Sequence, residues 1–323
     1  MPETGFLQAI RDAMAEEMHR DPNVFLMGED CRHSLFGTTS GMVAEFGLDR
    51  ILDVPLSEAG FVGAAAGAAM VGMRPIVDVT LASFLYPAFD QIVSIIAKSR
   101  YLYGGQTQVP LTIRSCMLYN INNAAQHSDR PYSTFMTIPG LKIVAPSSPA
   151  DAKGLLKSAI RDNDPVLVFE DGSLWSTKGA VPPGDFLIPL GKGEIKRSGT
   201  DITVFAVSGA VPLALAAADR LATEGCSVEV IDPRTIKPLD TAIVLESVAR
   251  TGRFVAVDPA HKSGSVASEI VAAVAEECFP YLKAAPQRVT TPDIPIPFSP
   301  SLEKGLYPSV ASIAAAIRDA VGG

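Results

Sequence analysis

The sequence predicts an α/β protein with two doubly wound domains, each built on a mainly parallel sheet. Short apolar runs, such as residues 24–27 and 202–207, alternate along the chain with segments whose apolar residues recur at helical spacing. Buried strands of parallel sheets are typically such apolar runs, and their alternation with helices indicates a doubly wound fold. A stretch rich in Pro, Gly and Lys interrupts the pattern at 176–198. We therefore expect domains at 1–175 and 199–323, joined by a linker at 176–198.

The composition narrows the class of function. The chain has 323 residues, of which 47% are hydrophobic and 19% charged, so two domains of ordinary size can form large cores. The net charge of −8 argues against nucleic acid as a main partner. No apolar run reaches membrane-span length without a charge or a Pro, so we expect no membrane segment. The first residues lack the basic and apolar regions of a secretory signal.

The cysteines indicate a reducing compartment. The four of them lie far apart in the sequence, without a C-x-x-C pair or clustered His. We interpret them as reduced thiols rather than as a zinc site or a disulfide framework, and we expect a cytoplasmic protein.

The spacing of apolar residues and the positions of Gly and Pro predict the order of helices and strands. In the first domain we expect helices at 4–19, 42–46, 58–70, 87–101 and from 149, and strands at 24–27, 51–52, 75–80, 109–114, 141–144 and 165–169. In the second we expect strands at 202–207, 227–231 and 254–257, and helices at 211–222, 242–249, 266–277 and 310–321. The polar segment 119–134 is expected to be a long loop, which is usually functional or disordered.

The stretch around Glu58 is the most informative. Ser57 is a good helix N-cap residue, and Glu58 begins a helix of almost only small and apolar residues, which predicts tight packing on every side. On position alone, a solvated first-turn carboxylate is the simpler interpretation, and a buried acid with a chemical role is the alternative.

Six motifs then occur in a consistent order along the chain. They are P-L-S-E-A-G at 55–60, S-F-L-Y-P-A-F-D-Q-I at 83–92, P-G-L-K-I-V-A-P-S at 139–147, D-A-K-G-L-L at 151–156, I-D-P-R-T-I-K-P at 231–238 and A-S-E-I at 267–270. Together they resemble the β subunit of thiamine-diphosphate-dependent 2-oxo acid dehydrogenases, the E1 component of pyruvate, branched-chain and acetoin complexes. The resemblance implies a transketolase-like fold, with a pyrimidine-binding domain followed by a C-terminal transketolase domain.

The resemblance also implies that this chain carries half of a cofactor site. In the family, Mg²⁺ on thiamine diphosphate is held by G-D-G and N-N on the α subunit. Here Asp171-Gly172 and Asn122-Asn123 occur in the reverse order and without the first Gly, so we interpret them as unrelated. An α-type E1 subunit is therefore the expected partner, in an α2β2 heterotetramer, with a lipoyl acyltransferase (E2) as a further partner.

The resemblance assigns cofactor contacts to residues of the first domain. Glu58 would hydrogen-bond N1′ of the pyrimidine, where a desolvated carboxyl with a raised pKa shares a proton with the ring and makes the 4′-imino base accessible. Phe84 would lie against the ring, and Leu56 would pack nearby. Glu29 would join acidic groups linking two active sites. The alternatives are a core role for Phe84 and a solvated or capping role for Glu29.

The family implies two further features. Some members bind a monovalent cation, which here would involve Leu111, Ala159, Ile160, Asp162 and Asp164. His127 would act as an acid or base near the acceptor. The His-Ser pair at 127–128 remains, but the usual Gly-rich approach is replaced by M-L-Y-N-I-N-N at 117–123. The run D-P-A-H at 258–261 stands where relatives often have a His-Glu pair.

Three hypotheses for function follow. The leading one is an E1 β subunit that decarboxylates a 2-oxo acid and transfers the acyl group to a lipoyl domain. The unusual 117–132 loop motivates the second, a two-chain transketolase-like or acyloin-forming enzyme with the same cofactor and a different acceptor. The third is a catalytically silent subunit that only binds a partner, against which the joint presence of Glu58, Phe84 and His127 argues. Lipoyl-domain acylation separates the first two.

Overall fold

Each half of the chain contains its own sheet. The computed structural model describes residues 3–118 and 120–322. The chain divides into one unit of residues 1–118 and 134–190 and a second of residues 119–133 and 191–323. The polar segment after residue 118 therefore groups with the second unit, although its sequence position lies inside the first expected domain. The boundaries 1–175, 176–198 and 199–323 stay a prediction.

The first unit is built on a parallel sheet whose strands run in the order β6-β7-β5-β4-β2-β3. Its strands are β2 (Val24–Gly28), β3 (Ile51–Asp53), β4 (Arg74–Leu81), β5 (Thr112–Met117), β6 (Lys142–Val144) and β7 (Val166–Asp171). Its helices include α1 (Phe6–Arg20), α2 (Met42–Phe46), α3 (Glu58–Met70) and α6 (Pro149–Arg161). Short elements are η1 (Ala82–Leu85), η2 (Gln91–Ile96), α4 (Ser99–Leu102), α5 (Tyr132–Met136, across the boundary at 133/134) and η4 (Gly172–Leu174).

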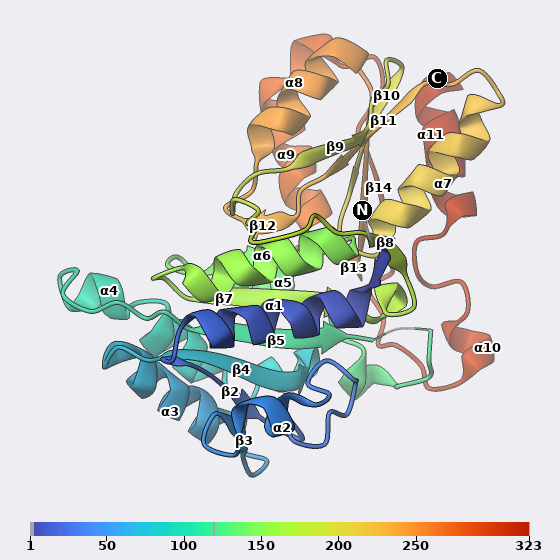
Figure 1. The fold of residues 1–323 in the computed structure, drawn as a ribbon. Coiled ribbons are helices and arrows are strands. Elements are labelled where there is room, and N and C mark those ends of the chain that lie inside the picture. The colour runs from blue at the N-terminus through green and yellow to red at the C-terminus, as the bar shows by residue number, and fades with distance from the viewer. Residues whose placement is uncertain (1–2, 119, 323) are drawn as a thin grey trace. The chain divides into compact units, whose positions relative to one another are not determined.

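Helices cover both faces of this sheet. Figure 1 shows α1 and α6 side by side on one face and α3 on the other. Phe6, Ile10 and Met14 recur along one side of α1 and are fully buried, because this spacing places them on the face toward the sheet. Ser148 caps α6 by accepting a hydrogen bond from Asp151 N, and Pro149 occupies the first turn.

Two expected elements differ in the structure. The helix expected at 87–101 is a π-helical turn, η2, followed by the short helix α4. The turn is wide because Ala97 N donates to Ile92 O, five residues back, and Gly140 packs so closely that a Cβ there would lie 1.9 Å from Ala97 O. The strand expected at 109–114 is shifted to β5, since Pro110 cannot donate to a strand ladder.

The stretch expected as a linker also has regular structure. Its residues 178–180 form β8 (Lys178–Ala180), which pairs antiparallel with β1 (Glu3–Gly5) in a separate two-stranded sheet. Residues 194–197 form β9 (Glu194–Arg197), an edge strand antiparallel to β11. Both strands are polar, so the apolar pattern did not predict them. Polar and charged residues are common in edge strands.

The second unit has a sheet in the order β14-β13-β10-β11-β9, parallel except for β9. Its strands are β10 (Ile202–Ala206), β11 (Val228–Asp232), β12 (Thr235–Lys237), β13 (Phe254–His261) and β14 (Gln287–Thr291). Its helices are η3 (Ala125–His127), α7 (Ala210–Ala222), α8 (Thr241–Thr251), α9 (Val266–Glu277), η5 (Phe279–Tyr281), α10 (Pro300–Glu303) and α11 (Val310–Gly322). Figure 1 shows α7 and α11 on one face and α8 and α9 on the other.

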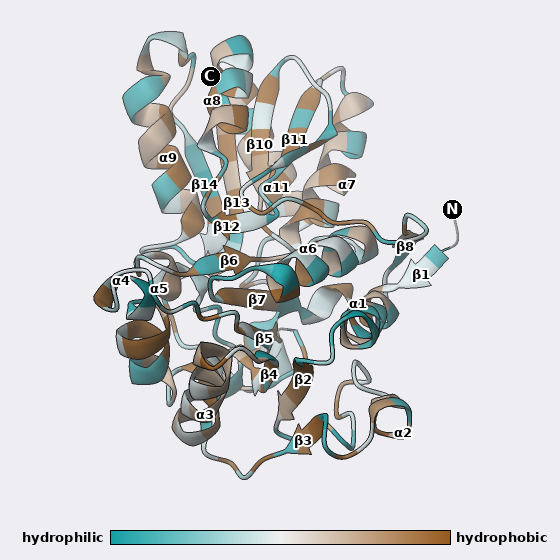
Figure 2. Cartoon of the chain, turned by 60° about the vertical axis from the view of Figure 1, so that its left-hand side comes forward, coloured by the Kyte–Doolittle hydropathy of each residue, from teal (hydrophilic) through white to brown (hydrophobic). Residues whose placement is uncertain are grey.

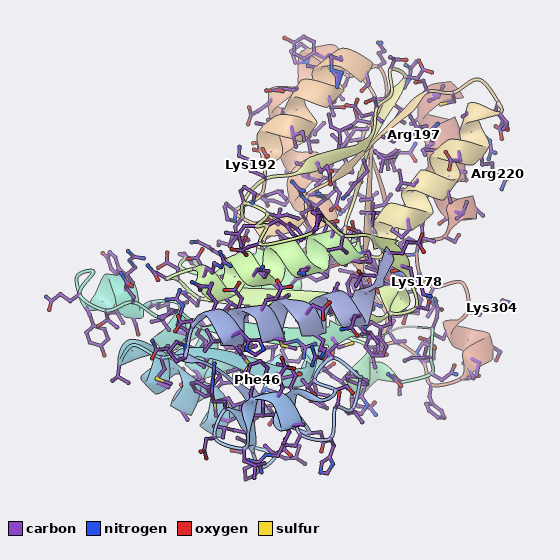
Figure 3. All side chains as sticks on the ribbon, in the orientation of Figure 1. Phe46, Lys178, Lys192, Arg197, Arg220 and Lys304 are labelled. Atoms are coloured by element: carbon purple, nitrogen blue, oxygen red, sulfur yellow. The ribbon has the colours of Figure 1, made fainter. Side chains whose placement is uncertain are left out.

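The apolar residues follow this layering. Figure 2 shows β7 and β10 coloured largely as hydrophobic, and both strands are buried along their whole length. In Figure 3 the labelled basic side chains of the second unit lie apart from one another; they are Lys192, Arg197, Arg220 and Lys304. Within the described residues, no helix combines the length and apolar character that a bilayer crossing requires.

Candidate active site

The candidate site lies where the direction of the strand connections changes. From β2 the chain continues to β3 on one side of the sheet, whereas from β4 it continues to β5 on the other. Ligands of doubly wound sheets bind at the carboxyl ends of the strands beside such a switch point. Glu29 directly follows β2, and Thr80 to Phe84 span the end of β4. Glu58 follows β3 as the first residue of α3.

Helix α3 sets the position of Glu58. Phe61, Val62 and Ala65 are buried, and the helix packs against β4 and η2. Ser57 occupies the N-cap position as expected, but its side chain makes no capping hydrogen bond. Glu58 is half-buried, so it is neither a fully solvated nor a fully buried acid in this chain. The helix N-terminus favours its negative charge.

Glu29 is the most perturbed acid of the site. Its side chain is buried, and its Oε1 has no hydrogen-bond partner among the described residues. Burial, followed by the negative charges of Glu58, Asp30 and Asp78, raises the pKa of Glu29 to about 7. The structure therefore brings Glu29 and Glu58 close enough to interact electrostatically. A buried carboxyl that titrates near neutrality is typical of functional sites.

The end of β4 is strained, which sequence reasoning missed. Thr80 has a φ of 62°, a left-handed conformation that is rare for a β-branched residue. Its N–H donates to Asp78 Oδ1 at 2.9 Å. Asp78 also pairs with Arg114, whose Nε and Nη2 donate to Glu170 at 2.8 and 2.6 Å. The one signal in the sequence was a charged residue, Asp78, within an apolar strand. Such strain clusters at active sites.

Phe84 and Leu56 differ in exposure. Phe84 is half-buried and packs against the buried side chains of Leu81, Cys116 and Leu118. It therefore has a core contact and retains an accessible part. Leu56 is 81% exposed, which leaves it available to a ligand or to another chain. The role of each at a cofactor stays a prediction.

The oxygens proposed for a monovalent cation have hydrogen-bond donors from the chain itself. Arg74 Nε donates to Ile160 O at 3.1 Å, and its Nη2 donates to Asp162 O at 2.8 Å. The carboxylate of Asp162 accepts from Lys142 Nζ at 2.7 and 2.8 Å.

The remaining oxygens of that set are similarly engaged. Leu111 O and Ala159 O accept backbone N–H groups, and the Asp164 carboxylate pairs with Arg100. No group of three or more His, Cys, Asp or Glu side chains in the described residues is arranged to hold a metal. A cation here stays a prediction, and it would share these oxygens with Arg74.

His127 belongs to the second unit, whereas Glu29, Glu58 and Phe84 belong to the first. It ends the short helical turn η3 and is half-buried. Tyr119, at the start of the expected loop, lies outside the described residues. The loop itself is ordered by contacts with the second unit, among them a hydrogen bond from the Tyr132 hydroxyl to the buried Asp258 carboxylate.

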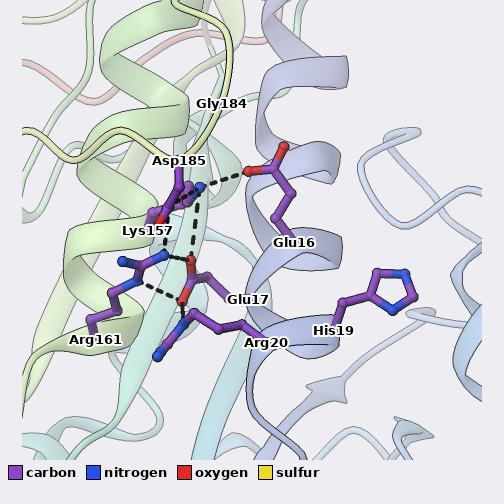
Figure 4. Close-up of a pocket in the computed structure, with 8 residues that line it drawn as sticks. All are labelled: Glu16, Glu17, His19, Arg20, Lys157, Arg161, Gly184 and Asp185. Carbon is purple, nitrogen blue, oxygen red and sulfur yellow. Dashed lines mark hydrogen bonds and ion pairs between the residues drawn. The ribbon is translucent and has the colours of Figure 1, made fainter.

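A separate cavity of about 530 Å³ lies between α1 and α6 and is drawn in Figure 4. Glu17 is fully buried and accepts from Arg161 Nε at 2.9 Å and Nη2 at 2.6 Å. Lys157 Nζ lies 2.7 Å from a Glu16 oxygen and 2.6 Å from an Asp185 oxygen. Because opposite charges are paired there, we interpret the side chains that line this cavity as a network of ion pairs that joins the two helices.

The switch-point site fits the pyrimidine of thiamine diphosphate. A ligand that carries ring nitrogens and an amino group requires polar partners beside an aromatic face. Here Glu29 Oε1, Thr80 Oγ1 and Ser83 Oγ are buried without partners among the described residues, at the ends of β2 and β4. Buried polar atoms are normally satisfied, so their number here indicates a polar ligand or partner.

Comparison with known proteins gives an independent result. Residues 4–176 match the transketolase pyrimidine-binding domain, and residues 191–313 match the transketolase C-terminal domain. A solved structure described as "Split gene transketolase, inactive beta4 tetramer" superposes with a TM-score of 0.81 at 23% identity, covering 98% of each chain. That likeness supports the fold.

Full-length relatives are more specific. The β subunit of acetoin:2,6-dichlorophenolindophenol oxidoreductase from Bacillus subtilis is 44% identical over 97% of this chain and 96% of its own. The 2-oxoisovalerate dehydrogenase β subunit of the same organism is 42% identical over 97% of both chains. The pyruvate dehydrogenase E1 β subunit of Rhizobium meliloti is 41% identical over 96% of this chain and 68% of its own. The chain therefore belongs to the transketolase-like family of E1 β subunits of thiamine-diphosphate-dependent 2-oxo acid dehydrogenases.

Proposed function

We propose that this chain is the β subunit of a two-chain enzyme that decarboxylates a 2-oxo acid and transfers the acyl group to a lipoyl domain. The observation that carries the proposal is the pair Glu29 and Glu58 at the switch point, with a buried, unpartnered oxygen on Glu29. Thiamine diphosphate supplies a nucleophilic carbon for attack on the substrate carbonyl. This chain supplies the acids and the apolar surface around its pyrimidine.

Each residue of the site has a defined task in this proposal. Glu58 holds a proton at N1′ of the pyrimidine, Phe84 covers the ring and excludes water, and Leu56 contacts the cofactor or the partner chain. Glu29 keeps a second proton beside Glu58, which its raised pKa supports. A carboxyl that titrates near neutrality can both take up and release a proton at ordinary pH.

The proposal includes an α-type subunit that binds Mg²⁺ and the pyrophosphate. Support comes from the exposed apolar side chains of the first unit, among them Val71 at 82%, Tyr101 at 89% and Leu102 at 64% exposure. Apolar surface of this kind favours a protein partner. An α2β2 assembly and an interaction with a lipoyl acyltransferase follow as parts of the proposal. A cytoplasmic location stays a prediction.

The experiment is to express the chain with an α-type subunit that carries G-D-G and N-N. The complex is then assayed with Mg²⁺, thiamine diphosphate and an artificial electron acceptor against pyruvate, branched-chain 2-oxo acids, acetoin and a sugar phosphate. Turnover of a 2-oxo acid, followed by acylation of a lipoyl domain, is the expected result. Turnover of acetoin or a sugar phosphate without acylation of the lipoyl domain would contradict it and favour the acyloin or transketolase-like alternative.

His127 is proposed to assist the acceptor step. The variant His127→Ala should retain 2-oxo acid oxidation by the artificial acceptor but lose acylation of the lipoyl domain by roughly 10²-fold, the usual effect of a positioned acid or base. Rates with the two acceptors are measured on the same preparation. Equal losses would move His127 to an earlier step, and unchanged rates would remove it from the mechanism.

A further inference from the structure

A buried carboxylate of the second unit holds the segment that carries His127. We call residues 120–133 the acceptor segment. Glu303, at the end of α10, is 1% exposed. Its Oε1 accepts the backbone N–H of Asn120 at 2.8 Å, and its Oε2 accepts that of Asn122 at 3.0 Å. Both oxygens of one carboxylate therefore bind the backbone at the start of the acceptor segment.

The backbone at these positions has an unusual conformation. Asn120 and Asn122 have positive φ values of 57° and 60°, and Ala124 combines a φ of 60° with an extended ψ of −176°. Alternation of left-handed residues turns successive N–H groups toward a common point, which forms a concave anion-binding site. A side chain of the same protein occupies that site here. Left-handed residues other than Gly persist only where their surroundings hold them, and Glu303 supplies that restraint.

Further contacts continue from Glu303 around the acceptor segment. The Tyr307 hydroxyl donates to Glu303 Oε1 at 3.0 Å, and the guanidinium of Arg130 lies 4.9 Å from the centre of the Tyr307 ring. Arg130 Nη1 donates to Ser128 O at 3.0 Å, and Ser128 Oγ donates to Ala124 O at 2.7 Å. These contacts enclose the helical turn η3, which ends at the proposed acceptor histidine.

The position of the acceptor segment also shapes a cavity. A space of about 510 Å³ is lined by Ala125 and Asp129 of the segment and by His261, Ser263 and residues 293–296. Movement of the segment would change the wall of this cavity, together with the orientation of the turn between Ala125 and Asp129.

We infer that Glu303 is a positioning residue for acyl transfer. By binding the N–H groups of Asn120 and Asn122, it fixes the acceptor segment and thereby places His127 for the acceptor step. The inference rests on the proposed function, because it assigns Glu303 an effect that passes through His127.

The test uses Glu303→Gln in the assembled two-chain enzyme. The substitution keeps the size of the side chain, but its amide group would face one of the two backbone N–H donors instead of accepting from it. We expect 2-oxo acid oxidation with the artificial acceptor to stay within about twofold of wild type. Acylation of a lipoyl domain should fall roughly ten- to hundredfold, the cost of a displaced reacting group. Hydrogen–deuterium exchange of peptides from 120–133 should become faster.

Two control variants separate positioning from general stability. Tyr307→Phe removes the hydroxyl, with its bond to Glu303 and its hydrogen bond with Arg130, but leaves both backbone bonds to Glu303 and the ring beneath Arg130. Glu229→Gln changes another buried carboxylate of this unit, which pairs with Arg250 and does not contact the acceptor segment. Both variants should keep the wild-type ratio of the two activities and the wild-type exchange of the segment.

Three outcomes would overturn the inference. The first is that Glu303→Gln keeps the wild-type ratio of the two activities and the wild-type exchange rate, and the second is that it loses both activities equally. The third is that Glu229→Gln also loses acylation of the lipoyl domain while it keeps oxidation with the artificial acceptor. The variant His127→Ala separates this inference from the proposed function. If His127→Ala loses acylation and Glu303→Gln does not, the inference alone fails. If His127→Ala retains acylation, the proposed role of His127 is what fails.

Discussion

At the scale of single residues, Glu29 and Glu58 have different surroundings, although each follows a strand of the same sheet. Glu29 directly follows β2 and is buried, whereas Glu58 is half-buried at the N-terminus of α3. Enzymes separate the tasks of paired acids through such differences in environment. Glu29 is therefore suited to hold a proton near neutral pH.

The raised pKa of Glu29 predicts a pH-dependent stability. Because the folded-state pKa of about 7 exceeds the ordinary value of 4.5, the stability from protonated Glu29 is fully present below about pH 4.5. That contribution is lost as the pH rises through about 7. Glu29→Gln mimics the protonated form, so wild type should lose on the order of 2 kcal/mol relative to this variant between pH 5 and 8.

Urea unfolding of the chain at several pH values measures this difference. Glu276→Gln, which changes an exposed glutamate on α9, is the matched control and should follow wild type. If the unfolding free energies of wild type and Glu29→Gln keep a constant difference across this range, Glu29 does not titrate as described.

The sequence identifies some residues of the site better than others. Glu58 is found because a helix start, a small-residue helix and a motif coincide at one place in the chain. Thr80 and Ser83 are missed because their importance lies in backbone strain and in unpaired atoms, neither of which leaves a sequence pattern. Contacts that depend on neighbouring strands appear only in three dimensions.

At the scale of elements, the close pairing of β2 and β4 positions the site. A Cβ on Gly28 would lie 2.1 Å from Asp78 O, its partner across the strands. Gly28→Ala should therefore force the strands apart and destabilise the chain by about 2–3 kcal/mol. Gly67 lies exposed within α3, and a Cβ there would meet no atom within 4 Å. Gly67→Ala should stabilise the chain by about 0.5–1 kcal/mol.

Thermal and denaturant unfolding of both variants measures the two changes in the free energy of unfolding, which are predicted to have opposite signs. A destabilised Gly67→Ala together with a neutral Gly28→Ala would mean that strand β2 does not approach β4 as closely as described.

Periodicity predicts interior elements well and edge elements poorly. The helices at 42–46 and 266–277 have the expected bounds, and in the second of them the buried residues Val266, Ala267, Ile270 and Val274 recur along one side. Strands β9 and β14 are not predicted, since E-I-K-R and Q-R-V-T-T are polar; no residue of β9 and only Thr291 of β14 is buried. The left-handed positions of the acceptor segment were also not expected, because no Gly marks them.

At the scale of the whole molecule, the chain is expected to carry half of a cofactor site. The first unit offers acids and an aromatic face, and the resemblance to E1 β subunits implies that the α subunit holds Mg²⁺ and the pyrophosphate. We therefore expect the chain alone to bind thiamine diphosphate weakly, and the complex with an α-type subunit and Mg²⁺ to bind it tightly. Isothermal titration calorimetry on the chain and on the complex measures both affinities. Tight binding of thiamine diphosphate by the chain alone would contradict a cofactor site formed by two subunits.

The central claim is that Glu58 drives proton transfer on the cofactor, and exchange of the C2 proton of bound thiamine diphosphate tests it most directly. Glu58→Gln keeps the size and one accepting oxygen but cannot hold the N1′ proton. In the assembled enzyme it should bind cofactor almost normally, while C2 exchange slows by about 10²–10⁴-fold. This corresponds to roughly 3–5 kcal/mol in the barrier. Ser57→Ala, whose side chain makes no capping bond, is the adjacent control and should exchange like wild type. The exchange is measured by NMR in quenched samples. A C2 proton that exchanges at the wild-type rate in Glu58→Gln would contradict a role of Glu58 in this proton transfer.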